Sequence, residues 1–187
     1  MAVTTRRILL AIGGGIAAYK AADLCSKMAQ AGYQVQVVTT HAATKFIGDA
    51  TLAALSGRPV VHDGFDSRFP LGSHIELTRG IDAMVVAPAT ANLLSEFANG
   101  AASDLIGTLY LQNTRPVLLA PAMSDPMWNH PAVQRNIATL REDGCHFIGP
   151  EDGWLSCRVK GTGRMSEPAD ILCALESILP SSASESD

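Results

Sequence analysis

The sequence lacks the features by which membrane proteins, metalloproteins and nucleic-acid-binding proteins are usually recognised. Its four cysteines, Cys25, Cys145, Cys157 and Cys173, form no CxxC pair, which argues against a zinc site or a disulfide framework and suits a reducing cytoplasm. The formal net charge of −4 provides no basic surface for nucleic acid. No apolar stretch is long enough to span a bilayer. We therefore expect a cytoplasmic protein with no metal site, no nucleic-acid partner and no membrane contact.

One globular domain accounts for the length and composition. A chain of 187 residues, 47% of them hydrophobic, is large enough to bury a core. We expect the domain over residues 1–180 and a disordered tail over the polar residues 181–187. Arg6 and Arg7 before the apolar run 8–12 could belong to a twin-arginine signal peptide. Three glycines end that run and an amphipathic pattern follows, so we favour a first strand.

Apolar runs and amphipathic patterns alternate along the chain. Strands are predicted at residues 7–12, 34–39, 60–61, 83–87, 117–120 and 146–148. Helices or helical turns are predicted at residues 16–31, 43–46, 49–55, 75–79, 91–98, 103–112, 131–143 and 169–179. Residues 63–73 and the glycine-rich residues 150–168 are predicted loops. This alternation implies a single doubly wound parallel sheet with helices on both faces, a three-layer α/β fold of the Rossmann-like or flavodoxin-like kind.

Unusual residues follow four of the predicted strands. They occupy positions 13–15, 39–41, 87–92 and 121–123. In an open parallel sheet, ligands bind where strands end and helices begin, because free backbone N–H groups and helix dipoles meet there. We therefore expect these four segments to form one site.

The first of these segments indicates a nucleotide phosphate. Residues 13–18 satisfy the permissive dinucleotide pattern GxGxxG/A, which is weak evidence by itself. A dinucleotide site also needs an acidic residue after the second strand, whereas Thr39, Thr40 and His41 stand there. A mononucleotide such as FMN therefore fits better than NAD. The alternative is that the glycines only let helix and strand pack closely.

Five segments together carry a family resemblance. Residues 87–92 resemble the segment P-A-S-A-N-T, His74 stands in a segment like H-I-x-L, and residues 121–128 resemble P-A-M-N-x-x-M-W. Residues 155–157 and 161–168 resemble L-A-C-G and G-x-G-R-M-x-E-P, a segment that clamps the substrate. From about residue 7 to residue 179 the chain resembles the homo-oligomeric flavin-containing cysteine decarboxylases. Within that family it most resembles the members that convert 4′-phosphopantothenoylcysteine to 4′-phosphopantetheine in coenzyme A biosynthesis.

The resemblance implies a reaction and a role for several residues. FMN would oxidise the cysteine to a thioaldehyde, after which CO2 leaves and an enethiolate remains. His74 would be a base or an orienting group. Asn92 would donate to a flavin carbonyl or to the substrate, and Cys157 would supply the proton that makes the reaction redox-neutral. The implied assembly is a homo-oligomer built from trimers, either a trimer or a dodecamer.

The expected binding residues come from the same segments. The expected cofactor-binding residues are Gly13, Gly14, Gly15, Ile16, Thr39, Thr40, Phe46, Pro88, Ala89, Thr90, Ala91, Asn92, Asp104 and Met123. The expected substrate-binding residues are Ser124, Met127, Cys157, Arg164 and Met165. Met123 and Met127 could instead be core residues, and Arg164 could be a solvated loop charge.

Two departures from the family pattern leave the substrate open. Ser124 replaces the asparagine expected to bind the substrate carboxylate, and Arg158 replaces the glycine after the clamp cysteine. Asp125, if turned inward, would repel that carboxylate. One alternative substrate is the C-terminal cysteine of a peptide, released oxidatively as an aminoenethiol. Another alternative is a flavin-binding regulatory protein without turnover.

Other polar and sulfur-containing residues are expected to be structural. Cys25, Cys145 and Cys173 are expected to be small core residues. Histidines outside the motif, at positions 41, 62, 130 and 146, are expected to be structural or exposed. In the helix predicted at 16–31, Leu24 and Met28 are placed on the core face and Lys20 elsewhere.

Overall fold

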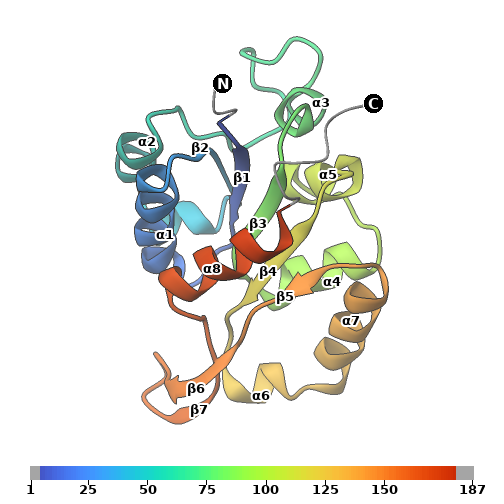
Figure 1. Cartoon of the computed structure of the whole chain (residues 1–187). Coiled ribbons are helices and arrows are strands. Elements are labelled where there is room, and N and C mark those ends of the chain that lie inside the picture. The colour runs from blue at the N-terminus through green and yellow to red at the C-terminus, as the bar shows by residue number, and fades with distance from the viewer. Residues whose placement is uncertain (1–4, 180–187) are drawn as a thin grey trace.

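The computed structural model describes residues 5–179 and contains the predicted parallel sheet (Figure 1). Five strands lie in the order β2-β1-β3-β4-β5, and every neighbouring pair is parallel. They are β1 (Arg7–Ile12), β2 (Gln34–Thr39), β3 (Ala83–Ala89), β4 (Val117–Pro121) and β5 (His146–Phe147). The doubly wound three-layer fold is therefore confirmed. The tail predicted over residues 181–187 lies outside the described residues.

Helices cover both faces of this sheet (Figure 1). One face carries α1 (Ala18–Gln30), α2 (Asp49–Ser56) and α8 (Pro168–Ile178). The other carries α3 (Ser73–Thr78), α4 (Ala91–Ala98), α5 (Leu105–Gln112) and α7 (Pro131–Glu142). Ile8, Leu10 and Ile12 of β1 point into the first core, while Leu9 and Ala11 point into the second. Burial on both faces explains why the strands appear in the sequence as unbroken apolar runs.

The expected loop over residues 150–168 was wrong, because it contains a β-hairpin. Strands β6 (Glu151–Trp154) and β7 (Lys160–Arg164) pair antiparallel and form a sheet of their own. Their glycines and charged residues show no apolar alternation, since neither strand has a face in the main core. A short helix that the sequence did not indicate, α6 (Asp125–Trp128), follows β4 beside this hairpin.

Smaller differences concern element ends and cysteines. Residues 60–61 contribute a single bridge, between Val61 and Val38, rather than a strand. The first helix begins at Ala18, and residues 43–45 form the 3₁₀ helix η1 (Ala43–Lys45). Cys25 is buried as expected, but Cys145 is half-buried and Cys173 is exposed, so the expectation for Cys173 was wrong.

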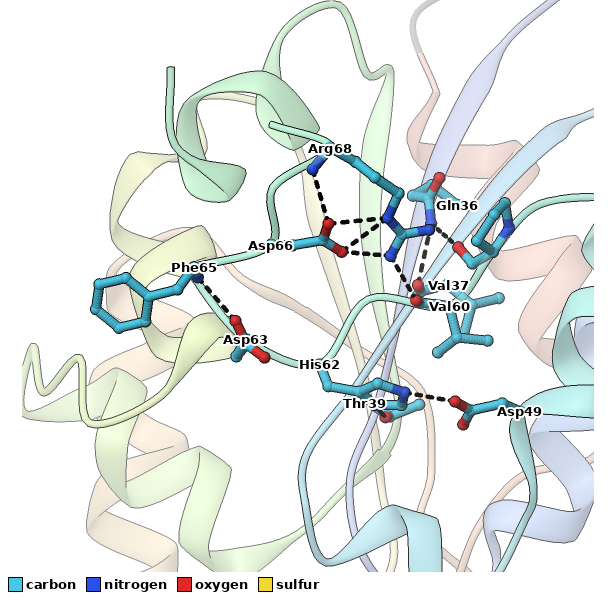
Figure 2. A network of polar contacts seen from close by, with 11 residues as sticks. Gln36, Val37, Thr39, Asp49, Val60, His62, Asp63, Phe65, Asp66 and Arg68 are labelled. Atoms are coloured by element: carbon cyan, nitrogen blue, oxygen red, sulfur yellow. Dashed lines mark hydrogen bonds and ion pairs between the residues drawn. The ribbon is translucent and has the colours of Figure 1, made fainter. Parts of the chain in front are cut away.

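Polar contacts attach the loop before α3 to strand β2 (Figure 2). The Gln36 side-chain amide donates to the backbone oxygen of Pro59 at 2.9 Å. His62 lies between the Thr39 hydroxyl and the Asp49 carboxylate, with both contacts at 2.7 Å. His62 therefore has the structural role expected for it. Within residues 5–179, no helix is long and apolar enough to cross a membrane.

Candidate active site

A cavity of about 690 Å³ lies where β1, β3 and β4 end. Its walls come from the turn after β1, the start of α4, the corner between β4 and α6, and the β6–β7 hairpin. Three of the four strand ends expected to form one site thus meet at this cavity. The residues after β2 do not line it.

The glycine turn between β1 and α1 leaves backbone donors open toward the cavity. The N–H of Gly13 donates to the Pro88 oxygen at 3.1 Å, and a Cβ at Gly13 would lie 2.5 Å from that oxygen. A Cβ at Gly14 would lie 2.3 Å from the Ala42 side chain, so both positions require glycine. Among the described residues, the N–H groups of Gly14, Gly15 and Ile16 have no protein acceptor. Unused donors at the beginning of a 13-residue helix form a cradle for an anion.

The start of α4 forms the second wall. The Thr90 hydroxyl accepts from the N–H of Leu93 at 3.3 Å and so caps the helix. Thr90 and Ala91 line the cavity, whereas Asn92 is exposed on the outer side of α4. The Asn92 amide donates to Glu96 at 2.9 Å, and the Ser103 hydroxyl donates to the same carboxylate oxygen at 2.7 Å. Asn92 therefore has a local partner and does not reach the cavity in this chain.

The corner after β4 brings Met123, Ser124 and Met127 into the cavity wall. Ser124 precedes α6, and its hydroxyl does not cap that helix. The Asp125 carboxylate accepts from the N–H of Thr162 at 2.9 Å and is therefore directed toward β7. This position removes the expected repulsion between Asp125 and a substrate carboxylate.

The hairpin closes the cavity from the opposite side. Its base is attached to the β4 corner, because the N–H of Met123 donates to the Gly163 oxygen at 3.0 Å. Gly163 has φ +139°, and a Cβ there would lie 2.1 Å from the Met123 oxygen. Its turn carries Cys157, which is exposed and lines the cavity. All five residues expected to bind substrate therefore meet in this cavity.

Three charged residues lie side by side in the cavity wall. Lys20 of α1 donates to the Met165 backbone oxygen and to Glu167, both at 2.9 Å. Arg164 of β7 bonds to the same carboxylate oxygen of Glu167. The pKa of Glu167 is lowered, first by the hydrogen bond from Lys20 and then by that from Arg164. Lys20, which was expected away from the core face of its helix, is only 8% exposed. Its spacing of four from Leu24, a core residue, was the signal that could have shown this.

Several expected cofactor residues lie outside the cavity wall. Thr39 is buried against His62, and the Thr40 hydroxyl accepts from the N–H of Ala43 at 3.2 Å. Asp104 caps α5 through the N–H of Gly107 at 2.9 Å. Gly13 directly follows β1, and its N–H is bonded to Pro88. Pro88 and Ala89 belong to buried β3, and Phe46, after η1, is 48% exposed.

His74 is far from the other expected catalytic residues. It lies on α3, which packs against α5 and, in Figure 1, stands at the end of the sheet opposite the β6–β7 hairpin. It does not line the cavity. Within one chain, therefore, the structure brings Cys157 to the cavity but not His74.

Sequence relatives agree with the motif resemblance. A family model described as Flavoprotein matches residues 2–179. The coenzyme A biosynthesis bifunctional protein CoaBC of Bacillus subtilis is 45% identical over 171 residues, which are 91% of this chain and 42% of that protein. CoaBC of Mycobacterium tuberculosis is 41% identical over 174 residues, 93% of this chain and 41% of that protein. The chain thus spans about two-fifths of the length of these curated relatives.

Solved structures with the same fold include flavin-dependent enzymes. A cysteine-to-serine mutant of a PPC decarboxylase complexed with pantothenoylaminoethenethiol has a TM-score of 0.83 and 30% identity, covering 92% of this chain and 97% of that one. The FMN-dependent cysteine decarboxylase SpaF has a TM-score of 0.79 and 29% identity, with coverages of 93% and 99%. The FMN binding protein AtHal3 has a TM-score of 0.79 and 31% identity, with coverages of 92% and 96%. The chain therefore belongs to the Flavoprotein family, and its resemblance to the flavin-containing cysteine decarboxylases is confirmed.

Proposed function

We propose that this chain is an FMN-dependent decarboxylase that converts 4′-phosphopantothenoylcysteine to 4′-phosphopantetheine in coenzyme A biosynthesis. The observation that carries the proposal is the cavity itself. It joins a glycine turn with open N–H donors to a hairpin that carries Cys157, Arg164 and Met165. The 45% identity to a coenzyme A biosynthesis protein favours this substrate over others of the family.

The cavity suits a mononucleotide. The open N–H groups of Gly14, Gly15 and Ile16 can hold one phosphate, and no acidic side chain after β2 is available for an adenosine ribose. When bound, FMN would supply the oxidation of the substrate Cβ–S unit and its later reversal. We expect the purified protein to be yellow and to release FMN on heating. Release of FAD or NAD would contradict the assignment of the site.

The residues of the chain would bind and protonate the substrate. The Ser124 hydroxyl can donate one hydrogen bond to the substrate carboxylate, and Arg164 can pair with an anionic group. Met123, Met127 and Trp154 give the cavity an apolar surface beside these polar groups. The Cys157 thiol would protonate the carbon that has lost CO2, and the hydride equivalent returned by the reduced flavin would then complete the saturated thiol.

His74 would act in the cavity of a second copy of this chain. The base that the family resemblance implies must approach the substrate, yet His74 stands at the opposite end of its own sheet. The loop before it exposes Phe65 at 99% and Leu71 at 59%, apolar side chains suited to burial against another copy. These features favour a homo-oligomer, which the resemblance suggests is built from trimers. His41, the histidine that follows β2, is an exposed loop residue and has no role in this proposal.

A peptide ending in cysteine is the second candidate substrate. The similarity to the cysteine decarboxylase SpaF favours it, whereas Ser124 does not discriminate, because both substrates present a cysteine carboxylate. The lower identity to SpaF, 29% against 45% for CoaBC of Bacillus subtilis, makes it the weaker candidate.

One assay separates these functions. The FMN-loaded protein is incubated with 4′-phosphopantothenoylcysteine or with a cysteine-ending peptide, and CO2 and thiol products are measured. We expect CO2 and 4′-phosphopantetheine from the first substrate without net flavin reduction. CO2 from the peptide alone would replace our proposal with the second candidate. A yellow protein without turnover of either would indicate a regulatory role.

A further inference from the structure

Lys20 is a buried charge that the proposed reaction leaves unused. Within residues 5–179 it is the only charged residue that is buried. It lies in the cavity wall as the third residue of α1. A buried ammonium is stable only when acceptors surround it. Lys20 has two, the Met165 backbone oxygen and the Glu167 carboxylate, each at 2.9 Å.

Glu167 connects Lys20 to Arg164. Its Oε1 accepts from both the Lys20 ammonium and the Arg164 guanidinium. Because the Glu167 carboxylate is held between two cations, it has little freedom to move. The position of Lys20 therefore determines where the guanidinium of Arg164 lies. Glu151, 3.9 Å from Arg164, is a weaker second partner. The planar guanidinium has five N–H donors, and those not bound to Glu167 remain for a ligand in the cavity.

Lys20 also connects two parts of the site that are far apart in sequence. Residue 20 follows the glycine turn in the same helix, whereas Met165 and Glu167 follow the hairpin, 145 and 147 residues later. The contact therefore sets the distance between the turn that would bind the flavin phosphate and the hairpin that would clamp the substrate.

We propose that Lys20 is a positioning residue that acts through Glu167 on Arg164, and that Arg164, held in this way, is the specificity-determining contact for an anionic group of the substrate. This inference rests on the proposed decarboxylase function. It concerns affinity for the anionic group rather than the bond-breaking step. Replacing Lys20 should therefore raise KM and leave kcat nearly unchanged.

The test is a set of variants measured as FMN-loaded proteins. Lys20→Met, Glu167→Gln and Arg164→Gln should each raise KM for 4′-phosphopantothenoylcysteine by ~10-fold or more, the loss expected for a charge-assisted hydrogen bond. Flavin content should match that of the wild type. In the Arg164→Gln background, Lys20→Met should add less than ~3-fold, because the residue through which it acts is already absent. Lys20→Gln, which keeps an N–H donor for the Met165 oxygen, is the second variant in case Lys20→Met does not fold.

Three ligands make the result specific to charge. Binding is measured with 4′-phosphopantothenoylserine, with pantothenoylserine and with pantetheine, whose saturated thiol is uncharged at neutral pH; none of the three presents a cysteine carboxylate for turnover. We expect Lys20→Met to weaken the first ligand and to leave the neutral ligand unchanged. Weakening of the first ligand alone would identify the phosphate as the group that Arg164 binds, and equal weakening of the first two would identify the carboxylate.

Three results would overturn the inference while leaving the proposed function intact. The first is a wild-type KM in the Lys20 and Glu167 variants, and the second is additive effects of Lys20→Met and Arg164→Gln. Equal weakening of all three ligands would also overturn it, since that would indicate a general disturbance of the cavity. If the wild-type protein does not turn over 4′-phosphopantothenoylcysteine at all, the proposed function fails first.

Discussion

At the scale of single residues, Ser124 stands where the family motif leads us to expect asparagine, and it lines the cavity. A serine hydroxyl is one atom shorter in reach than an asparagine amide and offers one donor instead of two. The Asp125 carboxylate beside it is held by Thr162, so the charge next to Ser124 does not face the cavity. If Ser124 binds the cysteine carboxylate as proposed, its short reach is the remaining obstacle.

We predict that Ser124→Asn raises kcat/KM for 4′-phosphopantothenoylcysteine by ~10-fold or more, because an added charge-assisted hydrogen bond contributes about 1.5–3 kcal/mol. Steady-state kinetics with that substrate and with a cysteine-ending peptide provide the measurement. Asp125→Asn is the matched control and should change kcat/KM less. If neither substrate responds to Ser124→Asn, then Ser124 does not bind the carboxylate.

Cys157 allows a second prediction at this scale. Its thiol lies in the cavity on the hairpin turn, where it can protonate the decarboxylated carbon. Cys157→Ser should still release CO2 in a first turnover, but an unsaturated thiol should build up and the flavin should stay reduced. Stopped-flow absorbance follows the flavin. The exposed Cys173 provides the control, since Cys173→Ser should behave as the wild type. Reoxidation of the flavin at the wild-type rate in Cys157→Ser would remove Cys157 from this role.

At the scale of elements, the hairpin depends on close backbone contact with the β4 corner. The Gly163 Cα faces the Met123 oxygen so closely that a Cβ would lie 2.1 Å away, and its φ is +139°. Gly163→Ala must therefore push the hairpin away from the corner, at a cost of about 1–3 kcal/mol for overpacking. We expect a lower melting temperature and a loss of turnover, measured by calorimetry and CO2 release. Gly64→Ala is the control, because nothing lies within 4 Å of a Cβ there. Equal behaviour of the two variants would show that the hairpin does not need this contact.

The loop before α3 provides a pH prediction at the same scale. Hydrogen bonds from Arg68 lower the pKa of Asp66 from 3.8 to about 2 (Figure 2). Because the folded pKa is the lower one, the stabilisation is fully present above the unfolded value of 3.8 and disappears as the pH falls through about 2.

Asp66→Asn should therefore lower the free energy of unfolding at pH 7, and the difference from the wild type should vanish near pH 2. Urea unfolding measured at several pH values tests this. The comparison is Asp63→Asn, which changes an exposed carboxylate that accepts from the N–H of Phe65 and not from Arg68. A difference between wild type and Asp66→Asn that is the same at pH 2 and pH 7 would contradict the assignment to the Arg68 pair.

At the scale of the whole molecule, the separation of His74 from Cys157 predicts that the working unit contains more than one chain. A His74→Asn chain keeps an intact Cys157, and a Cys157→Ser chain keeps an intact His74. If His74 acts in the cavity of a neighbour, mixed oligomers contain some cavities with both groups. Each variant alone should lose at least ~10²-fold in complete turnover, the low end for a lost acid–base group.

Co-expression of the two variants with different tags, followed by purification through both tags, should restore a measurable part of the wild-type activity. Flavin content should remain normal in all three preparations, since the glycine turn is unchanged. Activity no higher than the sum of the separate variants would place His74 outside the neighbour's cavity. A monomer by light scattering would contradict the shared site directly.

Much of the fold could be predicted because its signals are local. Each strand buried on both faces appears as an apolar run, and the first run ends at Gly13, a residue that neither a helix interior nor a strand interior favours. The order and direction of the strands then place those ends at one edge of the sheet. Sequence alone therefore determined the sheet, the family of the chain and three of the strand ends that line the cavity.

Tertiary structure decided the features that depend on contacts between distant residues. The hairpin forms because β7 bonds to the β4 corner, and such pairing leaves no apolar period in the sequence. From its helix pattern Lys20 is expected to be a surface charge. It is buried because it contacts Met165 and Glu167, which lie 145 and 147 residues later in the chain. The distance between His74 and Cys157 has the same origin: α3 leads into β3 at one end of the sheet, while the hairpin covers the other. Sequence motifs name the residues of a site, but the path of the chain determines which of them can meet within one molecule.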